Sequence, residues 1–369
     1  MRAENLHINP WVFRSGEVYM PPSSLTAGAA SVLRWYGLAC VAFSLAPGAS
    51  FACATCGCSL NADAATGYSA LPGWRINLEY DYINQDQLRF GTATATPAQV
   101  VNNPSNPYLG GGEIEKGTIN RYLTVGLGYA PTSEWNFNLQ VPYVMRTHTT
   151  YGQQSAPYNS AETAPDQISG SHFSELGDLK LVAAYQGFLA THTLGVQLGI
   201  KLPTGHYGTS VNFATGRNAG APLDASLQPG TGSTDLIIGG YYYQAVGQNV
   251  DAFFTGQFQS AVQHRQNQPG NDYRPGNTAS LSLGLRYEAH PNWIPQLQLN
   301  LTRKTPDQGA LADVPDTAGT VAYLSPGMTL SVVRNLRGFV FVQVPVYNQL
   351  DGYQVFPRWT ATAGASYAF

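Results

Sequence analysis

The sequence has few charged residues, and no long apolar run follows its first 52 residues. Charged side chains make up 11% of the chain, whereas an ordinary soluble domain carries about 25%. Because no stretch of about 18 apolar residues occurs after that point, membrane-spanning helices are excluded there. The net charge of −3 is too small to indicate nucleic-acid binding. Low charge with 39 Gly and 22 Tyr is typical of a barrel with a lipid-facing outside and an uncharged polar inside.

The beginning of the chain reads as a leader. The short apolar run 35–45 follows Arg34, and a small-residue cleavage pattern ends at Ala52. Met20 is an alternative start of translation. We therefore expect a leader or signal peptide over 1–52, a Cys-rich periplasmic tail over 53–73, and a barrel over 74–369.

The remainder alternates apolar and polar residues with a period of two, in twelve segments. Such alternation predicts strands with one apolar and one polar face. Long and short connections take turns between the segments. The pattern predicts an all-β fold, a transmembrane antiparallel β-barrel of about twelve strands. Because outer-membrane barrels place short turns in the periplasm, both termini are expected there.

The chain ends on an aromatic residue, Phe369, at the close of an alternating segment. This ending resembles the C-terminal signal strand of bacterial outer-membrane barrels, which the assembly machinery reads. Further aromatics fall near the expected periplasmic strand ends and predict an interfacial girdle: Trp74, Tyr129, Trp135, Tyr287, Trp293, Trp359 and Tyr367. We expect the outer membrane of a Gram-negative bacterium, with the lipid bilayer and the assembly machinery as partners.

Six charged residues fall at inward-facing positions of the expected strands. They are Asp178, Lys180, Lys201, Asp235, Arg286 and Glu288. Charges buried in a barrel should pair, so one interpretation of the first four, which fall on neighbouring strands, is a ladder of ion pairs that fills the lumen. The other is a charged constriction that selects solutes.

Three cysteines stand together at the start of the expected mature chain. Cys53, Cys56 and Cys58 have a spacing that lets three sulfurs converge on one soft ion, Cu or Zn. In the oxidising periplasm, one disulfide plus a free thiol is an equal alternative. Attachment to a periplasmic partner protein is a third.

Four short phrases resemble a known family. They are SELGD at 174–178, GIKLPTG at 199–205, LQPGTGSTD at 227–235 and QVPVY at 343–347. Together they resemble the outer-membrane transporter family named after the MetA pathway of phenol degradation. The resemblance covers most of 74–369. It implies a channel-like barrel, in some cases linked to hydrophobic or aromatic compounds, and carries no catalytic residues to this chain.

The predicted function is an outer-membrane channel or transporter for a small solute, passive, with hydrophobic or aromatic compounds as the candidate class. One alternative is a metal-handling or redox-linked barrel that uses the cysteine cluster. Another is an assembly or scaffold barrel for periplasmic proteins. No spacing of His, Ser or Asp indicates a catalytic site, so we expect no enzymatic activity.

Overall fold

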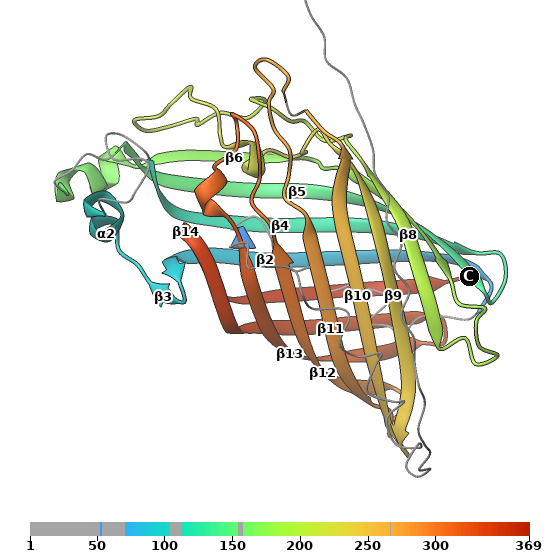
Figure 1. Cartoon of the computed structure of the whole chain (residues 1–369). Coiled ribbons are helices and arrows are strands. Elements are labelled where there is room, and N and C mark those ends of the chain that lie inside the picture. Colours follow the sequence, from blue (N-terminus) through green and yellow to red (C-terminus); the bar gives the residue numbers. More distant parts are fainter. Residues whose placement is uncertain (1–51, 54–70, 104–112, 154–157, 266) are drawn as a thin grey trace, which may run out of the picture. The chain divides into compact units, whose positions relative to one another are not determined.

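The computed structural model describes residues 52–53, 71–103, 113–153, 158–265 and 267–369 (Figure 1). The expected leader up to residue 51, and most of the expected tail, including Cys56 and Cys58, lie outside the described residues. None of the helices in the described ranges is long and apolar enough to cross a membrane.

Eleven antiparallel strands form one closed ring. Each strand pairs with the next along the ring, and the last strand pairs with the first. The strands are β2 (Gly73–Gly91), β4 (Glu113–Ala130), β5 (Trp135–Gln153), β7 (Leu179–Tyr185), β8 (Leu194–Leu202), β9 (Thr234–Gly247), β10 (Val250–Gln263), β11 (Thr278–Tyr287), β12 (Trp293–Lys304), β13 (Thr317–Val333) and β14 (Leu336–Ala368). Closure gives every strand a partner on both sides, so the predicted all-β antiparallel barrel is confirmed.

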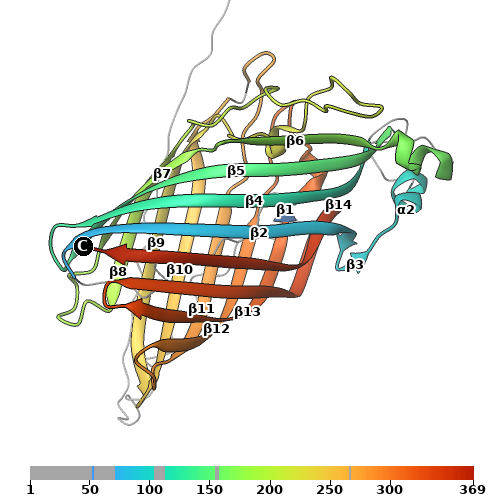
Figure 2. The ribbon, with the colours of Figure 1, turned by 180° about the vertical axis from the view of Figure 1, so that it is seen from behind.

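The strand count differs by one from the expected number because β14 is continuous through a bend. Up to Leu350 it pairs with β13, and from Tyr353 onward it pairs with β2. The end of β14 lies beside its start, where Ala368 N donates to the carbonyl of Asn335 at 3.0 Å, so the chain reverses between the two parts. Gly352 supplies the left-handed backbone of this bend, with φ of 54°. Figure 2 shows the final part of β14 beside β2.

Smaller elements extend the ring. Strand β6 (Ser169–Leu176) pairs with the second half of β5, directly ahead of β7. Strand β3 (Ala93–Thr94) pairs with β2, and β1 (Ala52–Cys53) pairs with the start of β13. The helices are α2 (Pro97–Asn102), η1 (Ser160–Thr163), η2 (Pro165–Gln167), η3 (Ala225–Leu227) and η4 (Val314–Asp316).

The two ends of the barrel differ. At one end, short turns join the strands, and Phe369 lies beside Trp74, the two residues exchanging backbone hydrogen bonds of 3.2 and 3.0 Å. We call this the turn end. At the other, the loop end, β2, β5, β8, β10 and β12 lead into longer connections.

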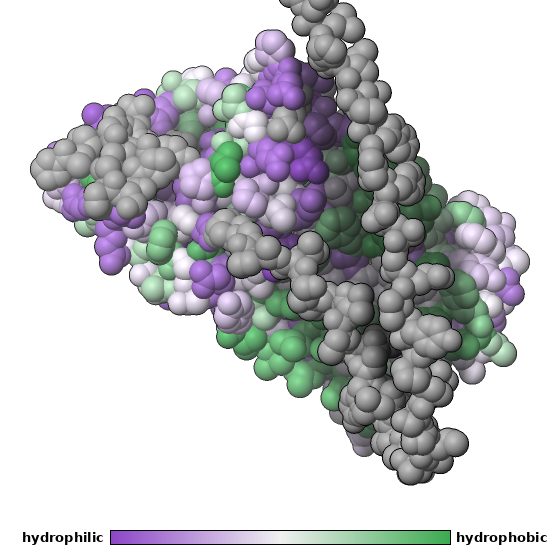
Figure 3. Space-filling model, viewed as in Figure 1, coloured by the Kyte–Doolittle hydropathy of each residue, from purple (hydrophilic) through white to green (hydrophobic). Residues whose placement is uncertain are grey.

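The wall alternates in the way that the sequence predicts. On β8, Leu198 is 58% exposed, whereas its neighbour Gln197 is buried. Along β12, Leu299 faces outward and Gln298 is fully buried. Figure 3 shows hydrophobic side chains gathered over the wall and hydrophilic ones over the loops. Because apolar side chains cover the outside, the polar faces of the strands line the lumen.

One member of the expected girdle is misplaced. Trp359 is exposed on the outer wall, but it lies beside the Thr360–Ile83 pair, well away from the turn end. There its ring contacts that of Tyr82 at 5.7 Å. The prediction was wrong for this residue because Trp359 lies near the start of the last expected strand and Phe369 ends it, so the two residues cannot lie at the same end of the barrel.

Candidate solute path and charged clusters

The loop 203–233 lies against the inner face of the barrel wall. Its apolar side chains share a core with inward-facing residues of β5 and β6; this core consists of Val144, Phe173, Val211, Phe213, Leu223 and Leu227. Arg146, which is inward-facing on β5, donates from Nη1 to the carbonyl of Leu227 at 2.5 Å and from Nε to Asn120 Oδ1 at 2.5 Å. The loop therefore narrows the lumen near the loop end.

A second arginine, in the connection after β10, also contacts this loop. Arg265 donates from Nη2 to the carbonyl of Thr231 at 3.0 Å. Its guanidinium lies over the ring of Tyr207 at 4.5 Å and over that of Tyr273 at 5.5 Å. These cation–π contacts and the hydrogen bond fix the loop to its neighbour.

Three of the six predicted lumen charges meet where this loop joins the wall. Lys201 Nζ lies 2.9 Å from Asp178 Oδ2 and 3.4 Å from Asp235 Oδ1, and all three side chains are more than nine-tenths buried. Lys201 also donates to the hydroxyl of Thr231 and, at 3.0 Å, to the carbonyl of Ser233. We call Asp178, Lys201 and Asp235 the lysine cluster. One ammonium faces two carboxylates, and further N–H donors stabilise the remaining negative charge: Gly205 and Thr231 donate to Asp178, and Gln259 donates to Asp235.

The other three predicted charges are placed differently. Lys180 is the register partner of Lys201 across β7 and β8 and interacts electrostatically with Asp178, Asp235 and Glu79. Arg286 and Glu288 form an ion pair of 3.1 Å at the turn end of β11. The six charges thus lie in two groups, one near the loop end of the barrel and one at the turn end.

Aromatic rings line the turn-end half of the lumen, and the sequence analysis missed them. Each ring lies on an inward glycine, where a Cβ atom would come within 2.4 Å of the ring. Three of these glycines belong to a neighbouring strand, and the fourth belongs to the second part of β14. The pairs are Tyr241 on Gly195, Phe253 on Gly284, Phe341 on Gly327 and Phe339 on Gly364. An aromatic at an inward position, paired with a glycine on the next strand, is the signal that could have found them. We call these four rings the lumen rings.

The lumen rings form two runs. On the β9–β10 side, Tyr243 stacks on Phe253 at 5.5 Å and contacts Tyr241 at 6.3 Å. On β14, Phe339 and Phe341 are 6.4 Å apart. Between the runs, β12 and β13 present hydrogen-bonded amides and hydroxyls, such as Asn300 with Ser325 at 2.8 Å. The lumen wall therefore combines apolar rings with uncharged polar groups.

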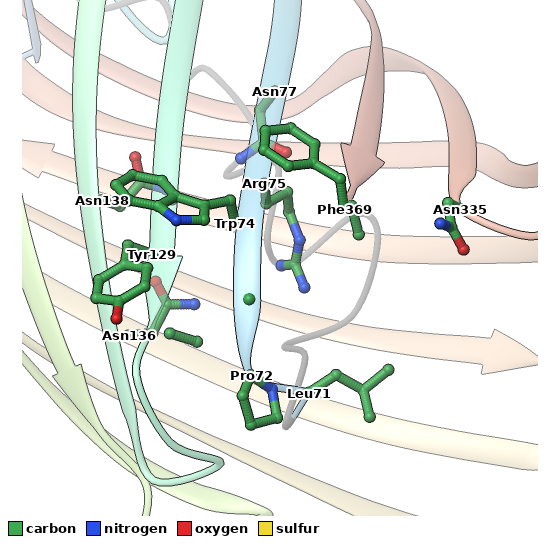
Figure 4. Close-up of a pocket in the computed structure, with 14 residues that line it drawn as sticks. Leu71, Pro72, Trp74, Arg75, Asn77, Tyr129, Asn136, Asn138, Asn335 and Phe369 are labelled. Atoms are coloured by element: carbon green, nitrogen blue, oxygen red, sulfur yellow. The ribbon is translucent and has the colours of Figure 1, made fainter.

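A cavity of about 170 Å³ opens at the turn end (Figure 4). Arg75 and Asn77 of β2 and Asn136 and Asn138 of β5 supply its polar lining, and Phe369 is part of its rim. Asn77 is 5% exposed, and its Oδ1 has no hydrogen-bond partner among the described residues. The sequence analysis named Phe369 as the assembly signal, and its ring is 59% exposed here.

At the loop end, η4 carries a carboxyl group that favours its protonated form. Asp316 Oδ1 accepts the backbone N–H of Tyr353 at 2.6 Å. Burial raises the pKa of Asp316 to about 8, and the carboxylate of Asp313 adds to the shift.

The first predicted cysteine lies at the loop end. The backbone of Cys53 pairs with Thr317, at the end of β13 opposite to Phe369. The sequence analysis expected the tail beside the periplasmic turns. Among the described residues no cluster of His, Cys, Asp and Glu could hold a metal ion. The metal site stays a prediction, since Cys56 and Cys58 lie outside the described ranges.

One of three similar solved structures shares this fold at a TM-score above 0.5. The COG4313 outer membrane channel from Pseudomonas putida F1 matches with a TM-score of 0.55 and 13% identity, over 82% of this chain and 98% of that one. The Ralstonia pickettii toluene transporter TbuX matches with a TM-score of 0.42 and 10% identity, over 81% and 90%. The P. putida toluene transporter TodX gives 0.38 and 11%, over 80% and 89%. No curated protein matches the chain.

The closed barrel, its apolar outer wall and its likeness to an outer-membrane channel place the protein in the outer membrane of a Gram-negative bacterium. The family described as "Putative MetA-pathway of phenol degradation" matches residues 117–359. This match covers well over half of the sequence and confirms the predicted resemblance. The chain therefore belongs to the family of the putative MetA pathway of phenol degradation.

Proposed function

We propose that the protein is a passive outer-membrane channel for small solutes, with single-ring aromatic compounds as the favoured class. The observation that carries this proposal is the closed barrel, which has an apolar outer wall and a lumen wall of aromatic rings and uncharged polar groups. The lumen rings are at most 3% exposed, so they contribute through the low polarity and the shape of this wall. The family description, which refers to phenol degradation, supports the same class.

The orientation is part of the proposal. Short turns face the periplasm in outer-membrane barrels, so both ends of the barrel segment, Gly73 and Phe369, belong on the periplasmic side. A solute from outside then meets the loop 203–233 and the lysine cluster first and the lumen rings afterwards. Passive diffusion is the simplest operation of such a lumen.

Planar lipid bilayers test this function. The purified full-length chain should conduct ions in KCl, and phenol should interrupt the current more often than cyclohexanol, which has the same size without the π-system. Replacing the inward ring of Phe253 with Leu should reduce the interruptions by phenol. Phe254→Leu is the matched control, because Phe254 is the adjacent residue and faces outward, 43% exposed. Absence of conductance, or equal effects of phenol and cyclohexanol, would contradict the proposal.

A further inference from the structure

The turn-end cavity extends over β4, where the inward residues are glycines. Gly128 lines the cavity, and its register partners on either side are Arg75 of β2 and Asn138 of β5. Two residues further into the barrel, Gly126 pairs with Asn77 of β2. Because glycine has no side chain, the inner face of β4 is a trough between the polar side chains of β2 and β5, two strands about 10 Å apart. We call Gly126, Gly128 and the flanking Asn77 and Asn138 the glycine trough.

Gly128 is an inward glycine on which no aromatic ring of the described residues lies. At the glycines beneath the lumen rings, a Cβ atom would come within 2.4 Å of the ring. At Gly128, a Cβ atom would make ordinary contacts only, the nearest at 3.6 Å from Arg75 Cβ. The cavity has a volume of about 170 Å³, and a cavity of about 150 Å³ is enough to hold one benzene molecule. The trough therefore offers a solute ring the same glycine surface on which the barrel packs its own rings.

Two amide oxygens at the glycine trough lack a donor. Asn77 is 5% exposed, and its Oδ1 and the Oδ1 of Asn138 have no hydrogen-bond partner in the described ranges. Both residues line the cavity. A Cβ atom at Gly126 would lie 3.4 Å from Asn77 Nδ2 and 3.6 Å from Asn138 Oδ1, so the two amides meet over one glycine. Since a buried carbonyl oxygen without a donor is costly, the pair indicates a ligand that brings two donors.

We propose that the glycine trough binds single-ring aromatic diols, with the ring on Gly128 and the two hydroxyl groups donating to Asn77 Oδ1 and Asn138 Oδ1. The inference deepens the proposed function by naming dihydroxylated rings as the favoured solutes, and it rests on that function for the role of the trough in transport. A phenolic hydroxyl is a donor. A ring with two hydroxyl groups therefore satisfies both amide oxygens, a ring with one satisfies one, and a ring without an O–H group satisfies neither.

Calorimetry with the full-length protein in detergent tests the site with four probes. Two are catechol and phenol. The third, 1,2-dimethoxybenzene, keeps the ring and both oxygens without an O–H donor, and the fourth, cis-1,2-cyclohexanediol, keeps both hydroxyl groups without the flat ring. Catechol should bind the unaltered chain most tightly. Phenol should bind roughly three- to tenfold more weakly, because one hydrogen bond is lost, and the other two probes should be weaker still.

The decisive variant is Gly128→Val, whose side chain takes the place of the solute ring while its Cβ makes only ordinary contacts. It should lose detectable binding of catechol. The matched control is Gly338→Val, because Gly338 faces outward on β14 beside the exposed Leu330, and a Cβ atom there also makes only an ordinary contact, at 3.7 Å. This control should bind catechol as the unaltered chain does.

Substitutions at Asn138 test the hydrogen bonds separately from the ring. Asn138→Leu should weaken catechol roughly three- to tenfold and leave 1,2-dimethoxybenzene unchanged, whereas Asn138→Asp keeps an acceptor and should retain the binding of catechol. Gel mobility before and after heating checks that each variant is folded. If Gly128→Val does not fold, the two Asn138 variants decide, since Asn138 is only partly buried.

Equal binding of catechol by Gly128→Val and the unaltered chain would overturn the proposed site, and so would equal binding of catechol and 1,2-dimethoxybenzene. Tighter binding of cyclohexanediol than of catechol would also overturn it, in favour of a site for non-aromatic diols. The binding measurement does not depend on transport. A protein that conducts ions and responds to phenol but does not bind catechol would leave the proposed function standing without this site. A protein that binds catechol in the trough but does not conduct would overturn the channel function alone.

Discussion

An arginine placed on the outer wall should cost far more than one placed on the lumen wall. Leu198 is central in β8 and 58% exposed, and its register partners Ala183 and Ile238 belong to the same outward face. With these side chains in hydrocarbon, Leu198→Arg should destabilise the barrel by about 2–4 kcal/mol. We expect the same for Leu299→Arg, which replaces a leucine between the outward Leu283 and Leu324.

The control substitution on the lumen wall needs an inward position with enough space for an arginine side chain. Gln298 is unsuitable, because it is fully buried and Arg would overpack it. Gln257 on β10 is half-buried and inward, beside the outward Phe258. Gln257→Arg should therefore cost well under half as much as Leu198→Arg.

Urea unfolding of liposome-inserted protein, followed by tryptophan fluorescence, measures the difference. With a urea dependence of about 2 kcal/mol per M, the outward variants should lose about 1–2 M from the unfolding midpoint. The reasoning is refuted if Gln257→Arg proves as damaging as Leu198→Arg. Such a result would mean that the inside and outside faces are exchanged, since a shift of one residue reverses every side chain of a strand.

Three further predictions concern single groups. Deleting Phe369, or changing it to Asp, should reduce the amount of heat-modifiable barrel in outer-membrane fractions, because its exposed ring forms the expected assembly signal. The control variant Phe369→Tyr should assemble. Normal assembly of the Asp variant would count against the signal. Lys201→Met should destabilise the barrel by about 3–5 kcal/mol, because two buried carboxylates lose their cation; denaturant unfolding measures this, and adding Asn at both carboxylate positions should restore part of the loss. We propose that the reduced tail binds one Cu or Zn ion through the thiolates of Cys53, Cys56 and Cys58. A triple Cys→Ser variant should then lose the metal that elemental analysis finds in the unaltered protein after anaerobic purification. Equal metal content in the two proteins would leave the disulfide alternative.

Periodicity was sufficient to predict the closed antiparallel barrel and the two faces of its strands. On the last segment, Ala363 and Tyr367 are exposed while Thr360, Thr362 and Ser366 are buried, as the alternation predicts. The reason is physical, because lipid on one side and polar contacts on the other impose a period of two on every strand. Alternation does not show whether the strand continues through a bend. The sequence analysis therefore expected a short loop between two strands where β14 continues through the bend at Gly352.

The grouping of the lumen charges could not be predicted from alternation. Periodicity shows that Lys180 and Lys201 face inward, but the register between β7 and β8 decides that they lie opposite each other. The lysine cluster also needs Thr231 and Ser233, which come from a loop folded inward by distant contacts with Arg146 and Arg265. The lumen rings were missed for a related reason, since each needs a glycine that only the register brings beneath it.

The order of groups along the lumen bears on what the channel can favour. At the loop end, Lys201 is paired with both carboxylates of the lysine cluster, and Arg146 donates to Asn120 and to the carbonyl of Leu227. Groups that are satisfied within the protein give up little to a passing solute. At the turn end, the lumen rings lie on glycines, and Arg286 Nη1 has no hydrogen-bond partner among the described residues. Selectivity for aromatic solutes should therefore arise in the turn-end half of the lumen. Substitutions at Phe253 or Phe339 should alter which solutes interrupt the current, while changes in the loop 203–233 should alter mainly the size of the current.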